Sequence, residues 1–250
     1  MPRHTRIEDS SGGEEEGEEY EPPSQSQGRS QLTQQDLTMH AGLVCNLLLA
    51  NEHKKIPTKR QDIRKLILKD QARHFPAIMK KASELMERVF GYKVKELEDK
   101  NYLLINGLGV SGGERISGTK TQAARTGLIT AVLAAIFMTD TQKMKEAVME
   151  EYLKTLGVDV QSKANPVLGN VNKLIYQDLV REKYLEVSLD KFTDPPTKEF
   201  RWGERAHLEL NKKEILELVC KIYGDNMDPK MWTAQWKEVE KEASGTTRPS

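Results

Sequence analysis

Residues 82–106 read ASELMERVFGYKVKELEDKNYLLIN, and the spacing of the apolar side chains changes in the middle of this stretch. Up to residue 90 the apolar residues follow the 3.6-residue period of a helix, whereas residues 92–97 alternate like a half-buried strand. Residues 102–106 read as the partner strand, with the turn at residues 98–101. Gly91 stands between the two periods, where a left-handed glycine would close the helix.

Two further helices are expected before this stretch. The leucine-rich segment 43–48 has helical spacing and predicts a first helix that ends near Asn51. Thr58 and Gln61 form a capping-box pattern that predicts the start of a second helix, and Pro76 lies where a third would begin. Three helices followed by a β-hairpin is the order of a winged helix.

The same order of elements returns in the second half of the chain. Residues 127–138 are apolar nearly all round and predict a central buried helix. Thr139 or Asp140 is expected to cap the next helix, which ends before Gly157. The remaining expected elements are a helical segment at 170–179, a second hairpin formed by 184–189 and 199–202 around a turn at 194–196, and closing helices at 211–223 and 229–243.

The expected fold class is therefore mainly α with small β-hairpins, arranged as tandem winged-helix domains. The expected organisation is a disordered acidic tail at 1–30, a first winged-helix domain at 37–107, a glycine-rich linker at 108–118, a second winged-helix domain at 119–243 and a tail at 244–250. Residues 1–30 hold eight acids, three bases and hardly a large apolar side chain, which is a composition typical of disorder.

Composition excludes several classes of protein. The longest apolar run, residues 128–138, is shorter than the roughly 18 residues that span a bilayer, so no membrane association is expected. The N-terminus lacks the basic-then-apolar pattern of a secretory signal. Two cysteines, Cys45 and Cys220, make neither a disulfide framework nor a thiolate metal site. We therefore expect no bound metal and a reducing compartment.

Nothing in the sequence resembles catalytic machinery. Residues 107–112, GLGVSG, match the dinucleotide fingerprint letter for letter, but no helix opens after them and the preceding strand belongs to a hairpin. The linker interpretation is favoured over a nucleotide site. The five histidines are scattered, and no serine, histidine and aspartate group suggests a nucleophile. We expect a protein that is not an enzyme and has no cofactor.

Positive charge is concentrated in the first half. Residues 54–81 contain ten bases and two acids, on the helices that a winged helix uses to approach DNA. Such a cluster predicts salt-sensitive binding to phosphates, with Lys59, Arg60 and Arg64 as candidate contacts. The alternative is a lysine-rich helix face that only keeps the protein soluble.

The three consecutive leucines at 47–49 exceed what one face of a helix can bury. One of them is a candidate for binding a partner protein. Contact with the second domain is an equally good interpretation of the same pattern.

Several motifs in order resemble the MAGE homology domain family. They are KKIP (54–57), HFP (74–76), RVFGY (88–92), TGL (126–128) leading to IFM (136–138), REKYLE (181–186) and FRWGERAH (200–207). The resemblance covers roughly residues 37–243, and the family's fold is a tandem winged helix. Within the family, FGYK (90–93) and YLLIN (102–106) look most like the non-SMC element three branch, which serves in the Smc five/six complex.

This resemblance implies a non-catalytic adaptor in the nucleus, associated with chromatin and acting in DNA repair. It implies binding to a RING-type ubiquitin-ligase subunit, which the adaptor stimulates, to a kleisin subunit, to Smc proteins through the complex, and to double-stranded DNA. Two alternatives remain, a MAGE-type regulator of another RING ligase and a winged-helix transcription regulator.

The resemblance also carries site residues. The family's RING-facing dileucine falls on Leu48 and Leu49. The family's basic DNA-binding surface maps to Lys173, Arg181 and Lys183 in the second half. The kleisin contact is implied on the second winged helix without assignment to residues.

Overall fold

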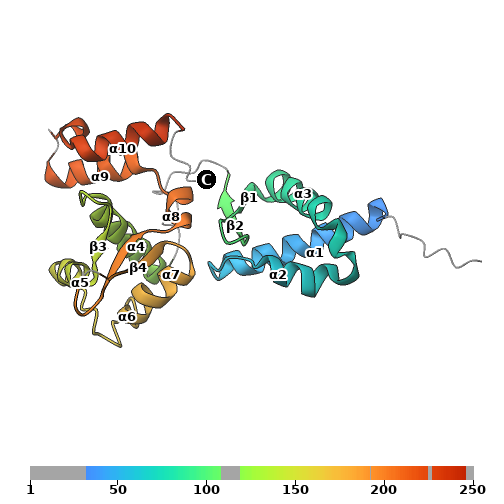
Figure 1. Cartoon of the computed structure of the whole chain (residues 1–250), viewed down its shortest axis with the longest axis horizontal. Coiled ribbons are helices and arrows are strands. Elements are labelled where there is room, and N and C mark those ends of the chain that lie inside the picture. Colours follow the sequence, from blue (N-terminus) through green and yellow to red (C-terminus); the bar gives the residue numbers. More distant parts are fainter. Residues whose placement is uncertain (1–31, 108–118, 192, 225–226, 246–250) are drawn as a thin grey trace, which may run out of the picture. The chain divides into compact units, whose positions relative to one another are not determined.

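A computed structural model describes residues 32–107, 119–191, 193–224 and 227–245 of the chain (Figure 1). The described residues from Thr33 onward belong to one compact unit. The unit contains helices and two small antiparallel sheets, so the expected fold class is confirmed. The tail predicted at 1–30 and the linker predicted at 108–118 lie outside the described residues, as does the fingerprint-like loop at 107–112 beyond its first glycine.

The first half follows the winged-helix order. Its elements are α1 (Gln34–His53), α2 (Arg60–Asp62), the π-helical turn η1 (Ile63–Leu68), the 3-10 turn η2 (Lys69–His74), α3 (Phe75–Leu85), the π-helical turn η3 (Met86–Phe90), β1 (Tyr92–Glu96) and β2 (Tyr102–Asn106). The Thr33 hydroxyl starts α1 by accepting the N–H of Asp36 at 3.1 Å. α1 packs against α3 through small and apolar side chains at helical spacing, namely Ala41, Val44, Cys45 and Leu48.

Gly91 turns the chain from helix to strand, as the sequence predicts. Its φ of 68° is left-handed, a conformation that glycine adopts without a Cβ clash. Its N–H donates to the Glu87 carbonyl at 3.2 Å and ends η3. β1 and β2 then pair antiparallel, from Tyr92 opposite Asn106 to the turn at residues 97–101.

Two predictions in this half are wrong. Thr58 does not cap the second helix, because its backbone N–H and C=O both bond to Tyr102 at 2.8 Å and extend the small sheet. The helix begins at Arg60 without a side-chain cap. The helical apolar stripe expected up to residue 90 predicts a buried Val89, but this side chain is 61% exposed, because the wider π-helical turn η3 shifts the phase of the stripe after Met86.

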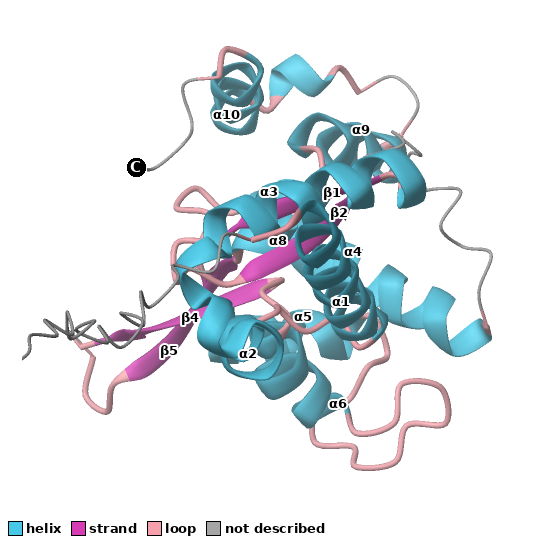
Figure 2. Ribbon diagram, turned by 90° about the vertical axis from the view of Figure 1, so that its right-hand side faces the viewer, coloured by secondary structure: helices cyan, strands magenta, loops and turns pink. Residues whose placement is uncertain are grey.

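The second half repeats the order with additions. Its elements are α4 (Lys120–Phe137), β3 (Met144–Lys145), α5 (Glu146–Thr155), α6 (Val171–Lys173), the π-helical turn η5 (Leu174–Asp178), α7 (Leu179–Arg181), β4 (Leu185–Asp190), β5 (Thr197–Trp202), α8 (Glu204–Glu209), α9 (Lys212–Tyr223), the 3-10 turn η6 (Pro229–Met231) and α10 (Thr233–Ala243). β5 lies between β3 and β4, and the β4–β5 hairpin is the longest ladder. Figure 2 shows β4 and β5 side by side.

α4 is the central helix that its composition predicts. Thr119 and Gln122 form a capping box at its start. Seven buried residues of the helix, between Leu128 and Phe137, are part of a hydrophobic core shared with α5, α9 and β5. The indole N–H of Trp202 reaches the Leu133 carbonyl at 2.8 Å, so the one polar atom of this buried ring is satisfied.

The cap expected at Thr139 or Asp140 is also wrong. The Thr139 hydroxyl instead donates to the Ile136 carbonyl at 2.7 Å, at the C-terminal end of α4. Met144 and Lys145 pair with β5, and α5 starts directly after this short strand. A two-residue strand has no periodicity of its own, and so its pairing with β5 decides where α5 begins.

Arg205 on α8 links the two halves. Its guanidinium is fully buried, and its Nη1 donates to Glu52 Oε2 at 3.2 Å and to Glu209 Oε1 at 3.0 Å. Nη2 donates to the Lys55 carbonyl at 3.3 Å and Nε to the Glu182 carbonyl at 2.8 Å. Burial opposes the charged form, but the two carboxylates raise the pKa of Arg205 above its usual value. The α1 helix of the first half is therefore tied to α8 of the second.

The backbone around Arg205 is equally constrained. The Arg205 N–H donates to the Lys183 carbonyl at 2.9 Å, and the Gly203 N–H to the Tyr184 carbonyl at 2.8 Å. A Cβ at position 203 would lie 2.3 Å from the Lys183 oxygen, so only glycine fits between β5 and α8. On the other side of the junction, the Glu204 carboxylate accepts the Glu98 N–H at 3.0 Å.

We predict that Arg205→Ala lowers the free energy of unfolding by about 3–5 kcal/mol, because it removes the buried guanidinium that pairs with both Glu52 and Glu209 and leaves Glu52 with Lys55 as its cation. Urea denaturation followed by circular dichroism measures the change. Arg181→Ala is the matched control, because that guanidinium is exposed and its removal should change stability by no more than about 0.5 kcal/mol. A decrease below about 1 kcal/mol for Arg205→Ala, the range of a surface ion pair, would contradict a buried link.

Candidate functional site

The three leucines at 47–49 of α1 differ in how deeply the packing of the helix buries them. Leu48 is 1% exposed and belongs to the core, whereas Leu47 and Leu49 are half-buried. At 100° per residue, Leu47 and Leu49 lie on opposite flanks of Leu48. Leu48 therefore contributes to the stability of the fold, whatever its part in binding a partner. Binding of a RING partner by either residue stays a prediction.

A second apolar feature of α1 was missed from the sequence. Met39 is 54% exposed and Leu43 46% exposed, and with Leu47 they recur every four residues along one flank of the helix. The spacing itself is visible in the sequence. The spacing alone does not show which apolar flank of a helix the tertiary packing leaves exposed.

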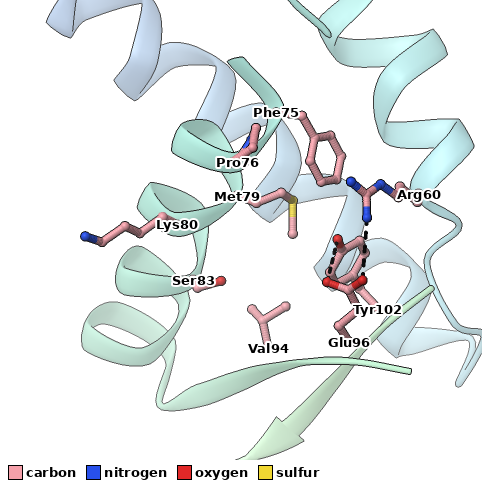
Figure 3. Close-up of a pocket in the computed structure, with 9 residues that line it drawn as sticks. All are labelled: Arg60, Phe75, Pro76, Met79, Lys80, Ser83, Val94, Glu96 and Tyr102. Atoms are coloured by element: carbon pink, nitrogen blue, oxygen red, sulfur yellow. Dashed lines mark hydrogen bonds and ion pairs between the residues drawn. The ribbon is translucent and has the colours of Figure 1, made fainter. Parts of the chain in front are cut away.

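Arg60 is one of the three predicted DNA contacts in the first half, and its charge is already matched. Its guanidinium lies 4.5 Å from the centre of the Phe75 ring, and its Nη1 is 3.5 Å from Glu96 Oε1 (Figure 3). The Tyr102 hydroxyl donates to the other oxygen of Glu96 at 3.2 Å. Burial together with the nearby Glu96 charge raises the pKa of Tyr102 to about 12, so the hydroxyl remains a donor at neutral pH.

Lys59 and Arg64 are exposed, and neither forms an ion pair with any residue that the structure describes. The same holds for three neighbouring bases of η1, η2 and α3, namely Lys65, Lys69 and Lys80. Positive charge without an internal carboxylate partner is what phosphate contacts need, because an existing ion pair would have to be broken first.

The three predicted bases of the second half also differ in whether a carboxylate of the described chain pairs with them. Lys173 is exposed at the end of α6 and has no ion pair with the described part of the chain. Arg181 pairs with Asp178 at 2.7 Å. Lys183 pairs at 2.9 Å with Asp99 in the turn of the first hairpin, and its φ of 67° is left-handed. Lys183 therefore contributes to the junction between the halves.

Asp99 supports this assignment of Lys183. Partial burial opposes ionisation of the carboxyl, but the Lys183 ammonium and the Asn101 N–H together hold its pKa below the usual value. The structure thus places the six predicted bases in two separate sets, one in each half, and only Lys59, Arg64 and Lys173 are free of ion pairs with described residues.

Within residues 32–107 and the later described ranges, no group of three or more histidine, cysteine, aspartate or glutamate side chains could hold a metal ion. Cys45 and Cys220 are both buried, and burial raises the pKa of the Cys45 thiol. Among the described helices, none is long and apolar enough to cross a membrane.

Known proteins resemble the chain over most of its length. It is 37% identical over 219 residues to the human non-structural maintenance of chromosomes element 3 homolog. The aligned residues are 87% of this chain and 71% of that protein. The mouse counterpart is 36% identical over 221 residues, covering 87% and 77%. Human melanoma-associated antigen D2 is 36% identical over 195 residues, which are 77% of this chain and 31% of the antigen.

A solved structure has the same fold. A chain of an Nse1-Nse3-Nse4 complex superposes with a TM-score of 0.76 at 32% identity, covering 83% of this chain and 99% of that one. The family model of the MAGE homology domain matches residues 44–213. The resemblance drawn from the motifs is confirmed, and the chain belongs to the MAGE homology domain family.

Proposed function

We propose that this protein is a non-catalytic adaptor subunit of the Smc five/six genome-maintenance complex. The observation that carries the proposal is the match to a chain of the Nse1-Nse3-Nse4 complex, which extends over nearly the whole of that chain. In this role the protein binds a RING-type ubiquitin-ligase subunit and a kleisin, reaches the Smc proteins through the complex, contacts double-stranded DNA and acts at chromatin in the nucleus.

The ligase activity belongs to the partner in this proposal. A RING needs closed zinc sites built from cysteine and histidine, and the whole chain has only two cysteines and five histidines. The adaptor therefore stimulates the ligase by positioning it.

For the RING partner we propose the exposed flanks of α1. Leu49 is the half-buried member of the predicted dileucine, and the stripe of Met39, Leu43 and Leu47 offers further apolar area on the same helix. Partially exposed apolar side chains are well suited to an interface because a partner can cover their remaining area. The kleisin is proposed to bind the second winged helix.

We expect Leu49→Asp to weaken co-purification with the RING subunit by about tenfold or more, equivalent to ~1.4 kcal/mol, while the protein stays folded. Leu48→Ala should instead lower the free energy of unfolding by about 2–5 kcal/mol, because it empties a core position. Calorimetric titration and thermal unfolding separate the two effects. Leu218→Asp, on an exposed leucine of α9, is the control for an added charge. Equal RING affinity of Leu49→Asp and Leu218→Asp would remove Leu49 from the interface.

For DNA we propose phosphate contacts by the bases without an ion pair in the described structure, Lys59 and Arg64 in the first half and Lys173 in the second. Sequence preference is not part of the proposal, because contacts to phosphates carry no base information. This distinguishes the adaptor from a transcription regulator, which would show a large ratio between specific and non-specific affinity.

We predict that Lys59→Glu with Arg64→Glu reduces duplex affinity and lowers the slope of log affinity against log salt by roughly 0.9 for each phosphate that is no longer neutralised. Lys173→Glu tests the second half alone in the same fluorescence-anisotropy titration. Arg60→Gln is the matched control, because Glu96 already holds that guanidinium and the slope should barely change. Lys183→Glu is unsuitable, since it would set two carboxylates against each other at Asp99. An unchanged slope in both charge-reversal variants would count against DNA contact at these residues.

The assembly itself is tested by affinity purification of the full chain from nuclear extract, read by mass spectrometry. Recovery of a RING protein together with a kleisin and Smc subunits is the expected result. A RING protein without kleisin or Smc subunits would instead favour a regulator of another ligase, an alternative kept open by the 36% identity to melanoma-associated antigen D2. Recovery of none of these partners would overturn both proposals.

A further inference from the structure

The outer edge of β1 is open. In the described part of the chain, β1 pairs with β2 alone. The Leu97 N–H donates to the Asn101 carbonyl at 2.8 Å, and in an antiparallel ladder every second residue bonds to the partner strand. The odd-numbered residues of β1 therefore turn their N–H and C=O groups toward β2. The backbone groups of Tyr92, Val94 and Glu96 point the other way, out of the sheet.

A cavity of about 330 Å³ lies directly behind this edge. Val94 of β1 and Met79, Ser83 and Pro76 of α3 line it, so strand and helix form its two walls (Figure 3). The cluster in which Arg60 and Tyr102 hold Glu96 closes one end. The side chains that alternate onto this face of β1 thus line a space that is large enough to receive an apolar side chain.

The charges around the edge are positive and lack a partner. Lys93 and Lys95 alternate onto the opposite face of β1, and Lys80 lies at the rim of the cavity. None of the three forms an ion pair with a described residue. The single acid of the strand, Glu96, is already matched by Arg60 and Lys100. Lysines on an edge strand discourage pairing with other strands by repulsion, and the one class of strand that they attract is acidic.

We propose that β1 receives an extended acidic segment of a partner protein as an added strand. The segment's main chain pairs with the outward N–H and C=O groups of Val94 and its neighbours. One apolar side chain enters the cavity between α3 and β1, and carboxylates on the alternate residues face Lys93 and Lys95. Main-chain pairing supplies affinity and the alternation of side chains supplies specificity. The proposal goes beyond the adaptor function and does not depend on it.

The probe is an acetylated and amidated peptide, Glu-Val-Glu-Leu-Glu-Val-Glu, added to the full chain. Amide hydrogen exchange followed by NMR should show new protection at Val94 and Glu96, whose N–H groups face outward. Val94→Pro removes one outward N–H and leaves the β2 ladder intact, as proline is tolerated at such edge positions. We expect it to lower peptide affinity roughly tenfold or more, whereas the lysine version of the peptide should not bind.

A second pair of peptides keeps the test valid if Val94→Pro fails to fold. One carries an N-methyl group on the central leucine and the other on the adjacent glutamate. In an added strand only one of these N–H groups faces β1, so one peptide loses binding and the other keeps it. Ser83→Phe, which fills the cavity, should also abolish binding of the unmodified peptide.

Three results would overturn the proposal. The first is no binding of the acidic peptide, and the second is equal binding of the two N-methylated peptides. The third is protection of Val94 and Glu96 by duplex DNA but not by the peptide, which would assign Lys93 and Lys95 to phosphate contacts.

Discussion

A guanidinium with no access to water fixes how the two winged helices meet. A buried cation is tolerated only where hydrogen-bond acceptors surround it and an anion matches its charge. Arg205 has four acceptors, two of them carboxylates, and half of these partners, the Glu52 carboxylate and the Lys55 carbonyl, belong to the first half. The arrangement of the halves is therefore the one in which this side chain is satisfied. Gly203 follows from it, because the close approach to Lys183 leaves no room for a Cβ.

Ion pairs within the folded chain also decide which charges remain for partners. Lys183 and Arg60 look like members of basic surfaces in the sequence, but Asp99 and Glu96 hold them in the folded chain. The bases that can serve ligands are those whose carboxylate partners are absent from the described structure, Lys59, Arg64 and Lys173 among them. α1 likewise contributes both to the interior and to the surface. One face builds the core through Leu48, its end supplies Glu52 to the junction, and only its flanks face outward.

Local patterns predicted the elements well. The change of period at Gly91 and the apolar helix at 127–138 identified a tandem winged helix, because periodicity and caps are properties of neighbouring residues. Two of the failures, at Thr58 and at the start of α5, come from pairing with residues far away in the chain. The backbone of Thr58 pairs with that of Tyr102, and the pairing of β3 with β5 sets the start of α5. The site was predicted less well. The motif FRWGERAH contains Arg205, but no role was predicted for this arginine, and nothing local shows that its partner is Glu52.

The distance along the chain between those partners has a consequence for biosynthesis. Glu52 and Arg205 are separated by 153 residues, so at usual rates of translation Arg205 is made roughly 8–30 s after Glu52, which until then has Lys55 as its near neighbour and ion-pair partner. During this interval the part of β2 that later contacts α8 stays uncovered. The surface of the first half is therefore complete only after the second half has been synthesised. The two halves thus reach their final folded surfaces together, although each has a core of its own.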